Sequence, residues 1–132
     1  MNNSITWKTK FTSQVLLNQK DGFKRLPLLQ EAQESPVFII SLSDINKDHF
    51  LDIFLGQNKF PDNPEVTRND NGRGIWLMGD GKGSFGYARS VKTGIEVFGQ
   101  ARGSSINDFN KDGKPDLVVV QKNGEARLFK RF

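Results

Sequence analysis

Short apolar segments alternate with turn residues along the whole chain. The apolar segments are rich in Val, Ile, Leu and Phe, and Gly, Asn and Asp separate them. Short apolar runs bounded by such residues predict β-strands. The predicted strands cover residues 5–11, 14–17, 23–29, 37–42, 51–55, 74–78, 85–89, 102–106, 117–121 and 126–132.

Turn signals fall between these segments, and helical periodicity is absent. The turn signals are Lys20-Asp21-Gly22, Asn71-Gly72, Gly79-Asp80-Gly81 and Lys122-Asn123-Gly124,. No segment sustains an apolar stripe at i, i+3, i+4 and i+7, and the best helix candidate, residues 28–34, is short enough that we expect a loop. Many short strands with regular turns predict an all-β fold, either a sandwich, a barrel or a propeller.

The chain also contains an internal repeat. Residues 44–52 and 108–116 share the pattern D-x-N-x-D-x-x-x-D at a spacing of 64 positions, and an apolar run follows each copy. A second echo relates the strand and Gly/Asp turn of residues 15–23 to residues 75–85, and residues 126–129 resemble a third copy of that strand. The spacing of about 60 residues matches one four-stranded propeller blade.

The repeated acidic pattern has the chemistry of a cation-binding loop. Oxygen side chains at positions 1, 3, 5 and 9 of a tight loop form a cage for a hard cation, most plausibly Ca²⁺. Position 7 would contribute a backbone carbonyl, because neither Phe50 nor Lys114 has a side chain that binds Ca²⁺. The predicted ligands are Asp44, Asn46, Asp48, Phe50 and Asp52 in the first loop, and Asp108, Asn110, Asp112, Lys114 and Asp116 in the second.

The alternative is an Asp/Asn-rich hairpin whose side chains cap backbone N–H groups and bind no metal. Two copies with identical ligand placement favour the metal. Position 6 of the loop needs a sharp turn with positive φ, which favours glycine. Gly113 fills this position in the second loop, whereas His49 fills it in the first. We therefore expect the first site to be weaker than the second, or its loop to bend differently.

These motifs carry a family resemblance. Phe98-Gly99-Gln100-Ala101, followed by the second acidic loop and Leu117-Val118-Val119, resembles the repeat of the FG-GAP/VCBS family of calcium-binding, integrin-α-type propellers. The run from Thr93 to Phe129 is similar to the terminal blades of bacterial cartilage-acidic-protein-like proteins. The resemblance extends from about residue 14 to the end of the chain. It implies Ca²⁺ at both loops, with the 108–116 site the more secure.

The resemblance also implies how the chain is organised. We expect outer strands over residues 5–29, a first blade over 37–93 and a second blade over 101–132. A propeller typically needs 4–8 blades, so this chain alone cannot close a ring. The remaining blades would come from a longer parent chain or from other copies of this chain.

Composition and charge narrow the classes of function. The 132 residues are one domain in length, and 11 Phe and 2 Trp can supply a core,. No apolar run approaches the roughly 20 residues of a membrane span, so no membrane insertion is expected. The absence of cysteine excludes a disulfide scaffold, a Cys-ligated zinc site and a thiol nucleophile,.

The net charge is +4, but the acidic residues are unevenly distributed along the chain. Six of the 15 acidic residues are the loop aspartates, and the other nine face 19 basic residues. Two bound Ca²⁺ would raise the net charge to +8. This basic exterior suits an anionic partner. The Lys and Arg residues are scattered, however, so nucleic acid is not favoured.

No catalytic residues are predicted. His49 is the single histidine and lies inside an acidic loop, so the familiar nucleophile–base pairs are missing,. Trp7, Trp76 and Tyr87 could stack on sugars if exposed, but strand positions favour core roles. We therefore do not expect an enzyme.

The function predicted from the sequence is a calcium-binding adhesion or ligand-binding module of a secreted or cell-surface protein. Its targeting segment would lie outside this sequence. The polar stretch Gly56–Arg73 is a candidate loop for binding a protein or glycan, although a solvated insertion is the simpler interpretation. The alternatives are a carbohydrate-binding lectin and an accessory domain of a polysaccharide-degrading enzyme.

Overall fold

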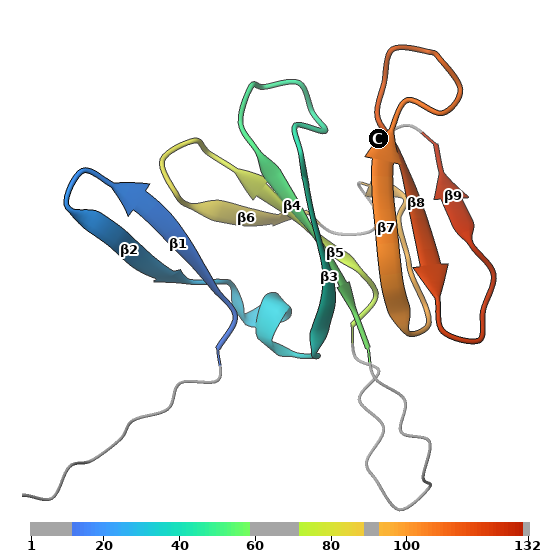
Figure 1. Cartoon of the computed structure of the whole chain (residues 1–132), viewed down its shortest axis with the longest axis horizontal. Coiled ribbons are helices and arrows are strands. Elements are labelled where there is room, and N and C mark those ends of the chain that lie inside the picture. Colours follow the sequence, from blue (N-terminus) through green and yellow to red (C-terminus); the bar gives the residue numbers. More distant parts are fainter. Residues whose placement is uncertain (1–11, 59–71, 89–92, 131–132) are drawn as a thin grey trace, which may run out of the picture.

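A computed structural model describes residues 12–58, 72–88 and 93–130 (Figure 1). Strands and turns dominate these ranges, as predicted, and each predicted strand within them is found to within a few residues. The strands are β1 (Gln14–Gln19), β2 (Gly22–Pro27), β3 (Val37–Ser43), β4 (Asp52–Gln57), β5 (Ile75–Gly79), β6 (Phe85–Ala88), β7 (Ala101–Asn107), β8 (Asp116–Gln121) and β9 (Arg127–Phe129).

The strands form three antiparallel units. β1 and β2 pair as a hairpin, β3-β4-β5-β6 form a four-stranded sheet, and β7-β8-β9 form a three-stranded sheet. We call the second and third units the first sheet and the second sheet. They lie side by side, with β3 next to β7, and the hairpin lies on the other side of the first sheet (Figure 1). The fold is therefore all-β with blade-like antiparallel sheets, as predicted, and the described strands do not close into a barrel.

Two predictions on local structure need comment. Residues 28–34 were expected to be a loop, but Gln30–Gln33 form a 3-10 helix. The Ala32 N–H donates to the Leu29 carbonyl at 3.0 Å, and the Ala32 side chain is fully buried. One turn is too short to produce a periodic pattern in the sequence. The predicted strand 5–11 and most of the Gly56–Arg73 stretch lie outside the described residues.

None of the described helical segments has the length and apolarity that crossing a membrane would require.

The internal repeat is visible in the strand register. Ser41 pairs with Phe54 in the first sheet, and Ser105 pairs with Val118 in the second, at an offset of 64 residues. All the remaining pairs between β3 and β4 also have counterparts between β7 and β8 at this offset. The register shift also recurs, between residues 37 and 39 and between residues 101 and 103. The sequence repeat is therefore a structural repeat of the first two strands of each sheet.

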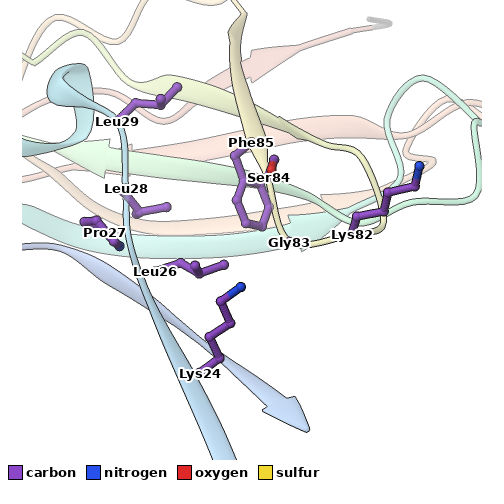
Figure 2. Close-up of a pocket in the computed structure, with 9 residues that line it drawn as sticks. All are labelled: Lys24, Leu26, Pro27, Leu28, Leu29, Lys82, Gly83, Ser84 and Phe85. Atoms are coloured by element: carbon purple, nitrogen blue, oxygen red, sulfur yellow. The ribbon is translucent and has the colours of Figure 1, made fainter.

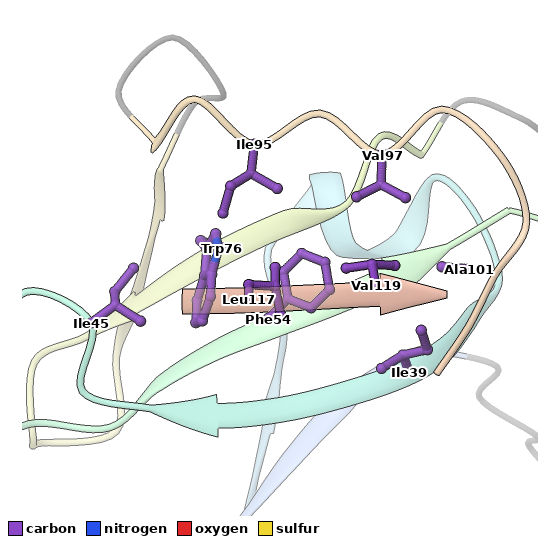
Figure 3. Close-up of a cluster of buried hydrophobic side chains, with 9 residues drawn as sticks. All are labelled: Ile39, Ile45, Phe54, Trp76, Ile95, Val97, Ala101, Leu117 and Val119. Atoms are coloured by element: carbon purple, nitrogen blue, oxygen red, sulfur yellow. The ribbon is translucent and has the colours of Figure 1, made fainter. Parts of the chain in front are cut away.

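The main core lies between the two sheets (Figure 3). Phe54 and Trp76 are almost completely buried there, with ring centroids 5.3 Å apart. Trp76 is thus a core residue, as its strand position predicts, whereas Tyr87 is 37% exposed. The buried members of this core are Ile39, Ile45, Phe54, Trp76, Ile95, Val97, Ala101, Leu117 and Val119.

A second apolar cluster lies on the opposite face of the first sheet. Its buried members are Ala32, Ile53, Leu55, Ile75 and Leu77. Val15 of β1 and Leu28, which follows β2, pack against them. The N-terminal segment therefore covers part of the face that the second sheet does not reach.

Replacing Phe54 with Ala should lower the free energy of unfolding by about 3–5 kcal/mol, because it removes a fully buried ring between the sheets,. The matched control is Phe23→Ala, since Phe23 is 68% exposed and its truncation should change stability by no more than about 0.5 kcal/mol,. Urea unfolding of the two variants tests this difference. Equal losses would contradict the assignment of the core.

Candidate metal centres

The two acidic loops lie at the same end of the two sheets (Figure 1). The first loop joins β3 to β4, so Asp44 follows one strand and Asp52 begins the next. The second loop joins β7 to β8, and Asp108 and Asp116 hold the same places there. The structure thus brings the predicted ligands of each set together in one hairpin loop.

Side chains of the first loop hold the backbone in place. The Asp44 carboxylate accepts hydrogen bonds from the N–H groups of Asp48 at 3.1 Å and His49 at 2.8 Å. Asn46 Oδ1 accepts from the Asp48 N–H at 3.0 Å, and Asp48 Oδ1 accepts from the Phe50 N–H at 2.8 Å. The Asn46 amide also donates to Asp48 Oδ2 at 2.7 Å. The side chains of Asp44, Asn46 and Asp48, which are predicted metal ligands, therefore each accept a hydrogen bond from a backbone N–H group of the loop.

The second loop repeats this pattern bond for bond. The Asp108 carboxylate accepts from the N–H groups of Asp112 at 3.0 Å and Gly113 at 2.8 Å. Asn110 Oδ1 accepts from the Asp112 N–H at 3.1 Å, and its amide donates to Asp112 Oδ2 at 3.0 Å. Asp112 Oδ1 accepts from the Lys114 N–H at 2.9 Å. The two loops therefore share one conformation despite their different residues at positions 6 to 8.

Position 6 has the positive φ that the sequence predicts. Its φ is 72° at His49 and 80° at Gly113. A Cβ added at Gly113 would meet nothing within 4 Å. The disadvantage of His49 is therefore one of backbone conformation and not of crowding, because non-glycine residues are strained in this region.

The aspartate at position 9 is the buried member of each set. Asp52 and Asp116 have no exposed surface. Asp52 Oδ2 accepts from the Ile45 N–H at 3.0 Å and its Oδ1 accepts from the Gly79 N–H at 2.9 Å, so this carboxylate ties the loop to the end of β5. Asp116 Oδ2 likewise accepts from the Phe109 N–H at 3.1 Å. The sequence analysis predicted this position as a ligand, with capping of N–H groups as the alternative, but it did not predict the link from Asp52 to β5.

The pKa of Asp52 is raised above its usual value. Burial is the largest cause, and the negative charges of Asp48 and Asp44 add to it. The hydrogen bonds from Gly79 and Ile45 oppose the shift without cancelling it. Ionisation of Asp52 is therefore less favourable in the folded protein than in the unfolded chain when no cation lies nearby,.

The donor set of each loop fits a hard cation. An ionised carboxylate has about four acceptor positions, and the hydrogen bonds above use only some of them. Carboxylate and amide oxygens are the donors that Ca²⁺ prefers. In the described ranges, no three His, Asp or Glu side chains lie in the close grouping of a bound metal. Because the loop side chains are turned toward their own N–H groups, the ligand sets stay a prediction.

One contact between the loops had no signal in the sequence. Lys47 Nζ of the first loop donates to the Gly113 carbonyl of the second loop at 2.9 Å. The link joins the two acidic hairpins at the outer end of the interface between the sheets. It lies between residues 66 positions apart, which local patterns cannot relate.

Two hollows near the β5–β6 turn show no catalytic arrangement in the described residues. His49 lies in a hollow with Asp80 and Ser84, but no hydrogen bond links its ring to either side chain there. Asp80 Oδ1 instead accepts from the N–H groups of Lys82 and Ser84, which lowers its pKa and forms the predicted hairpin turn. A separate hollow has a volume of about 270 Å³ (Figure 2). Lys24 and residues 26–29, from β2 and the linker that follows it, line one side, and residues 82–85, from the turn before β6 and its first residue, line the other. Lys24 and Lys82 lie there beside apolar side chains.

The stability contributed by Asp52 should fall as pH rises. Its folded pKa lies above the unfolded value of 3.8, so the folded state holds this proton more tightly and ionisation disfavours folding,. With EDTA present, the free energy of unfolding of the wild type should therefore decline, relative to Asp52→Asn, as pH rises from below 3.8 to neutral. Urea titrations of both proteins at each pH measure this difference. A difference independent of pH would contradict the raised pKa.

Comparison with known proteins gives two matches. The family model described as "FG-GAP-like repeat" matches residues 44–119, which begin at the first ligand of the first loop and include all of the second loop. Cartilage acidic protein 1 of Xenopus tropicalis is 33% identical over 100 residues, which cover 69% of this chain. The chain spans about 15% of the length of that relative. No solved structure matches the chain.

Proposed function

Because the chain belongs to the FG-GAP-like repeat family, we propose that it is a non-enzymatic, β-propeller-type binding module in which each acidic loop binds one Ca²⁺. One observation carries the calcium proposal: the two loops, 64 residues apart, share the same conformation and the same hydrogen bonds to the same four side-chain positions. Apart from the lysine at position 4, the residues at the other loop positions differ, so the oxygen ligands are the main feature that the two loops have in common.

Capping alone does not account for the charge of these loops. Neutral Asn, Ser or Thr side chains cap backbone N–H groups without mutual repulsion. Each loop instead carries three aspartates within nine residues, and in the first loop the charges of Asp48 and Asp44 add to the rise that burial causes in the pKa of Asp52. A divalent cation would reverse this repulsion and favour the ionised form of all three. The carboxylates are therefore better suited to a cation than to capping.

The proposed ligands are the predicted ones. In the first loop they are Asp44, Asn46, Asp48 and Asp52 with the Phe50 carbonyl, and in the second Asp108, Asn110, Asp112 and Asp116 with the Lys114 carbonyl. The metal would supply structural cross-linking of each hairpin and no chemistry. We propose an extracellular or cell-surface location, because the matched relative, cartilage acidic protein 1, is named for an extracellular tissue. Calcium modules outside cells bind with dissociation constants of about 10⁻⁴–10⁻³ M.

The proposed role is adhesion or ligand binding, and the ligand is a protein or a glycan. With two Ca²⁺ bound the chain would carry a net charge of +8, which favours an anionic ligand,. The burial of Trp76 weighs against the lectin alternative, because that ring cannot stack on a sugar.

Millimolar Ca²⁺ should raise the thermal stability of the protein relative to excess EDTA. A ligand that binds only the folded state adds RT ln(1 + [L]/Kd), so about 1 mM Ca²⁺ at dissociation constants of about 10⁻⁴–10⁻³ M adds roughly 0.4–1.4 kcal/mol per site. Asp108→Ala should lose at least half of the total gain, because it removes the stronger of the two proposed sites. The matched control is Asp21→Ala, which removes an exposed turn aspartate outside both loops and should keep the whole gain. A wild-type melting temperature that does not respond to Ca²⁺ would refute the metal and leave the fold assignment standing.

The first site should bind Ca²⁺ more weakly than the second. His49 has to hold a φ of 72° that glycine adopts freely, and this strain opposes the closed loop by about 1–2 kcal/mol,. Isothermal titration should therefore show a larger loss of affinity for Asp108→Ala than for Asp44→Ala. His49→Gly should tighten the weaker site, whereas a larger loss from Asp44→Ala would reverse the order.

A further inference from the structure

The repeat lets each sheet be compared with the other, position by position. Residue n of β3 or β4 corresponds to residue n + 64 of β7 or β8, as the shared register shows. Between the sheets, Ser41 Oγ and Ser104 Oγ lie 2.6 Å apart, and a Cβ at Gly56 would lie 3.0 Å from that of Ala101. This packed interface therefore shows how one blade receives the next.

On the face of the first sheet that points away from the second sheet, part of the apolar surface is uncovered. Ile106 of β7 packs against the core between the sheets, but its counterpart Leu42 is 57% exposed. Ile40, the counterpart of Ser104, is 67% exposed, and Leu51 is 61% exposed. The N-terminal segment packs against a cluster on this face whose buried strand residues lie on β4 and β5. We call the surface of Ile40, Leu42 and Leu51 the leading face.

A hollow beside the leading face has room for further side chains. It has a volume of about 470 Å³ and lies between β1 and the β3–β4 hairpin. Leu16 of β1, which is 57% exposed, and Phe50, which is 43% exposed, line it together with Leu42 and Leu51. In the described residues β1 pairs only with β2, so its other edge is open. An open strand edge beside an apolar hollow can accept a further strand.

The second sheet has a complementary uncovered face on its far side. Ile45 is buried between the sheets, whereas its counterpart Phe109 is 47% exposed. Val120, the counterpart of Gly56, is 43% exposed. We call the surface of Phe109, Ser105 and Val120 the trailing face. Positions that are buried in the first sheet are thus exposed in the second.

We propose that the trailing face of one copy docks on the leading face of a second copy, in a head-to-tail arrangement. The packed interface between the two sheets is the template, because it joins the counterparts of these faces: the first sheet contributes the face that corresponds to the trailing face, and the second sheet contributes the face that corresponds to the leading face. The template fixes the register: Ser105 of one copy lies beside Ile40 of the other, as Ser41 lies beside Ser104. It also places Lys111 where it can donate to the His49 carbonyl of the other copy, as Lys47 does to Gly113.

The joined blade needs only β7 and β8 of the incoming copy. β1 corresponds to β5, and so does β9, so both cannot occupy the third place in that blade. β9 has three residues paired with β8, whereas β1 is six residues long. We therefore assign the third place to β1, and β9 gives way. An interface of this heterologous kind closes into rings or continues as open chains. The proposal does not rest on calcium binding.

Two variants that each destroy one face test the arrangement. Leu42→Asp and Val120→Asp should each weaken self-association at least about tenfold, because a carboxylate replaces an apolar contact. Mixing the two variants should restore a 1:1 dimer, since each retains the face that the other lacks. Phe23→Asp, an exposed apolar position outside both faces, should associate like the wild type. Sedimentation velocity measures the association of the wild type, the three variants and the mixture, and circular dichroism checks that each variant is folded.

A wild-type chain that stays monomeric at every concentration would overturn the proposal. So would a mixture that stays monomeric while each variant is folded, because that result indicates a symmetric interface. The register has its own test, since the chain has no cysteine. Ile40→Cys mixed with Ser105→Cys should oxidise to a disulfide dimer, and neither single variant alone should do so. Equal dimer formation by Ile40→Cys alone would also overturn the head-to-tail register.

Discussion

Each sheet of this chain has two apolar faces, and a sheet cannot bury both without neighbours. The first sheet meets this constraint on one side with the second sheet, where Phe54, Trp76 and Leu117 are all but inaccessible to solvent. On the other side it relies on the hairpin and the 3-10 helix, whose Ala32 is fully buried. The covered and uncovered positions follow the same 64-residue offset, so the burial pattern reports where neighbouring blades belong.

The same constraint explains why the acidic loops lie together. Strands of neighbouring sheets pack face to face, so hairpin ends at equivalent positions fall at the same end of the molecule (Figure 1). Lys47 then reaches the Gly113 carbonyl, and the buried Asp52 connects its loop to Gly79 at the end of β5. The first loop is thereby coupled to the sheet beneath it and to the loop beside it. A cation bound in one loop would stabilise the hairpin and its neighbour together.

Most of the strands and both loops could be predicted from the sequence because their signals are local. Glycine and Asn/Asp turns mark the hairpins, and the side-chain spacing in D-x-N-x-D-x-x-x-D requires only nine neighbouring residues. The left-handed conformation of His49 followed from the position of Gly113 in the second copy. The 3-10 helix at Gln30–Gln33 was missed because a single turn has no period, and its formation depends on burial of Ala32.

Contacts between the repeats could not be predicted, because a repeat specifies a unit but not how units meet. The Lys47 link, the Ser41–Ser104 contact and the cap from Asp52 to Gly79 each join residues 27 to 66 positions apart. The offset supplies what local patterns lack: once one interface is known, every equivalent position acquires a predicted partner. Leu42 and Phe109 are exposed in this chain although their counterparts Ile106 and Ile45 lie at the core. Their exposure is therefore a property of the ends of the repeat and not of the repeat itself, and a further blade of the same kind has the surface to cover them.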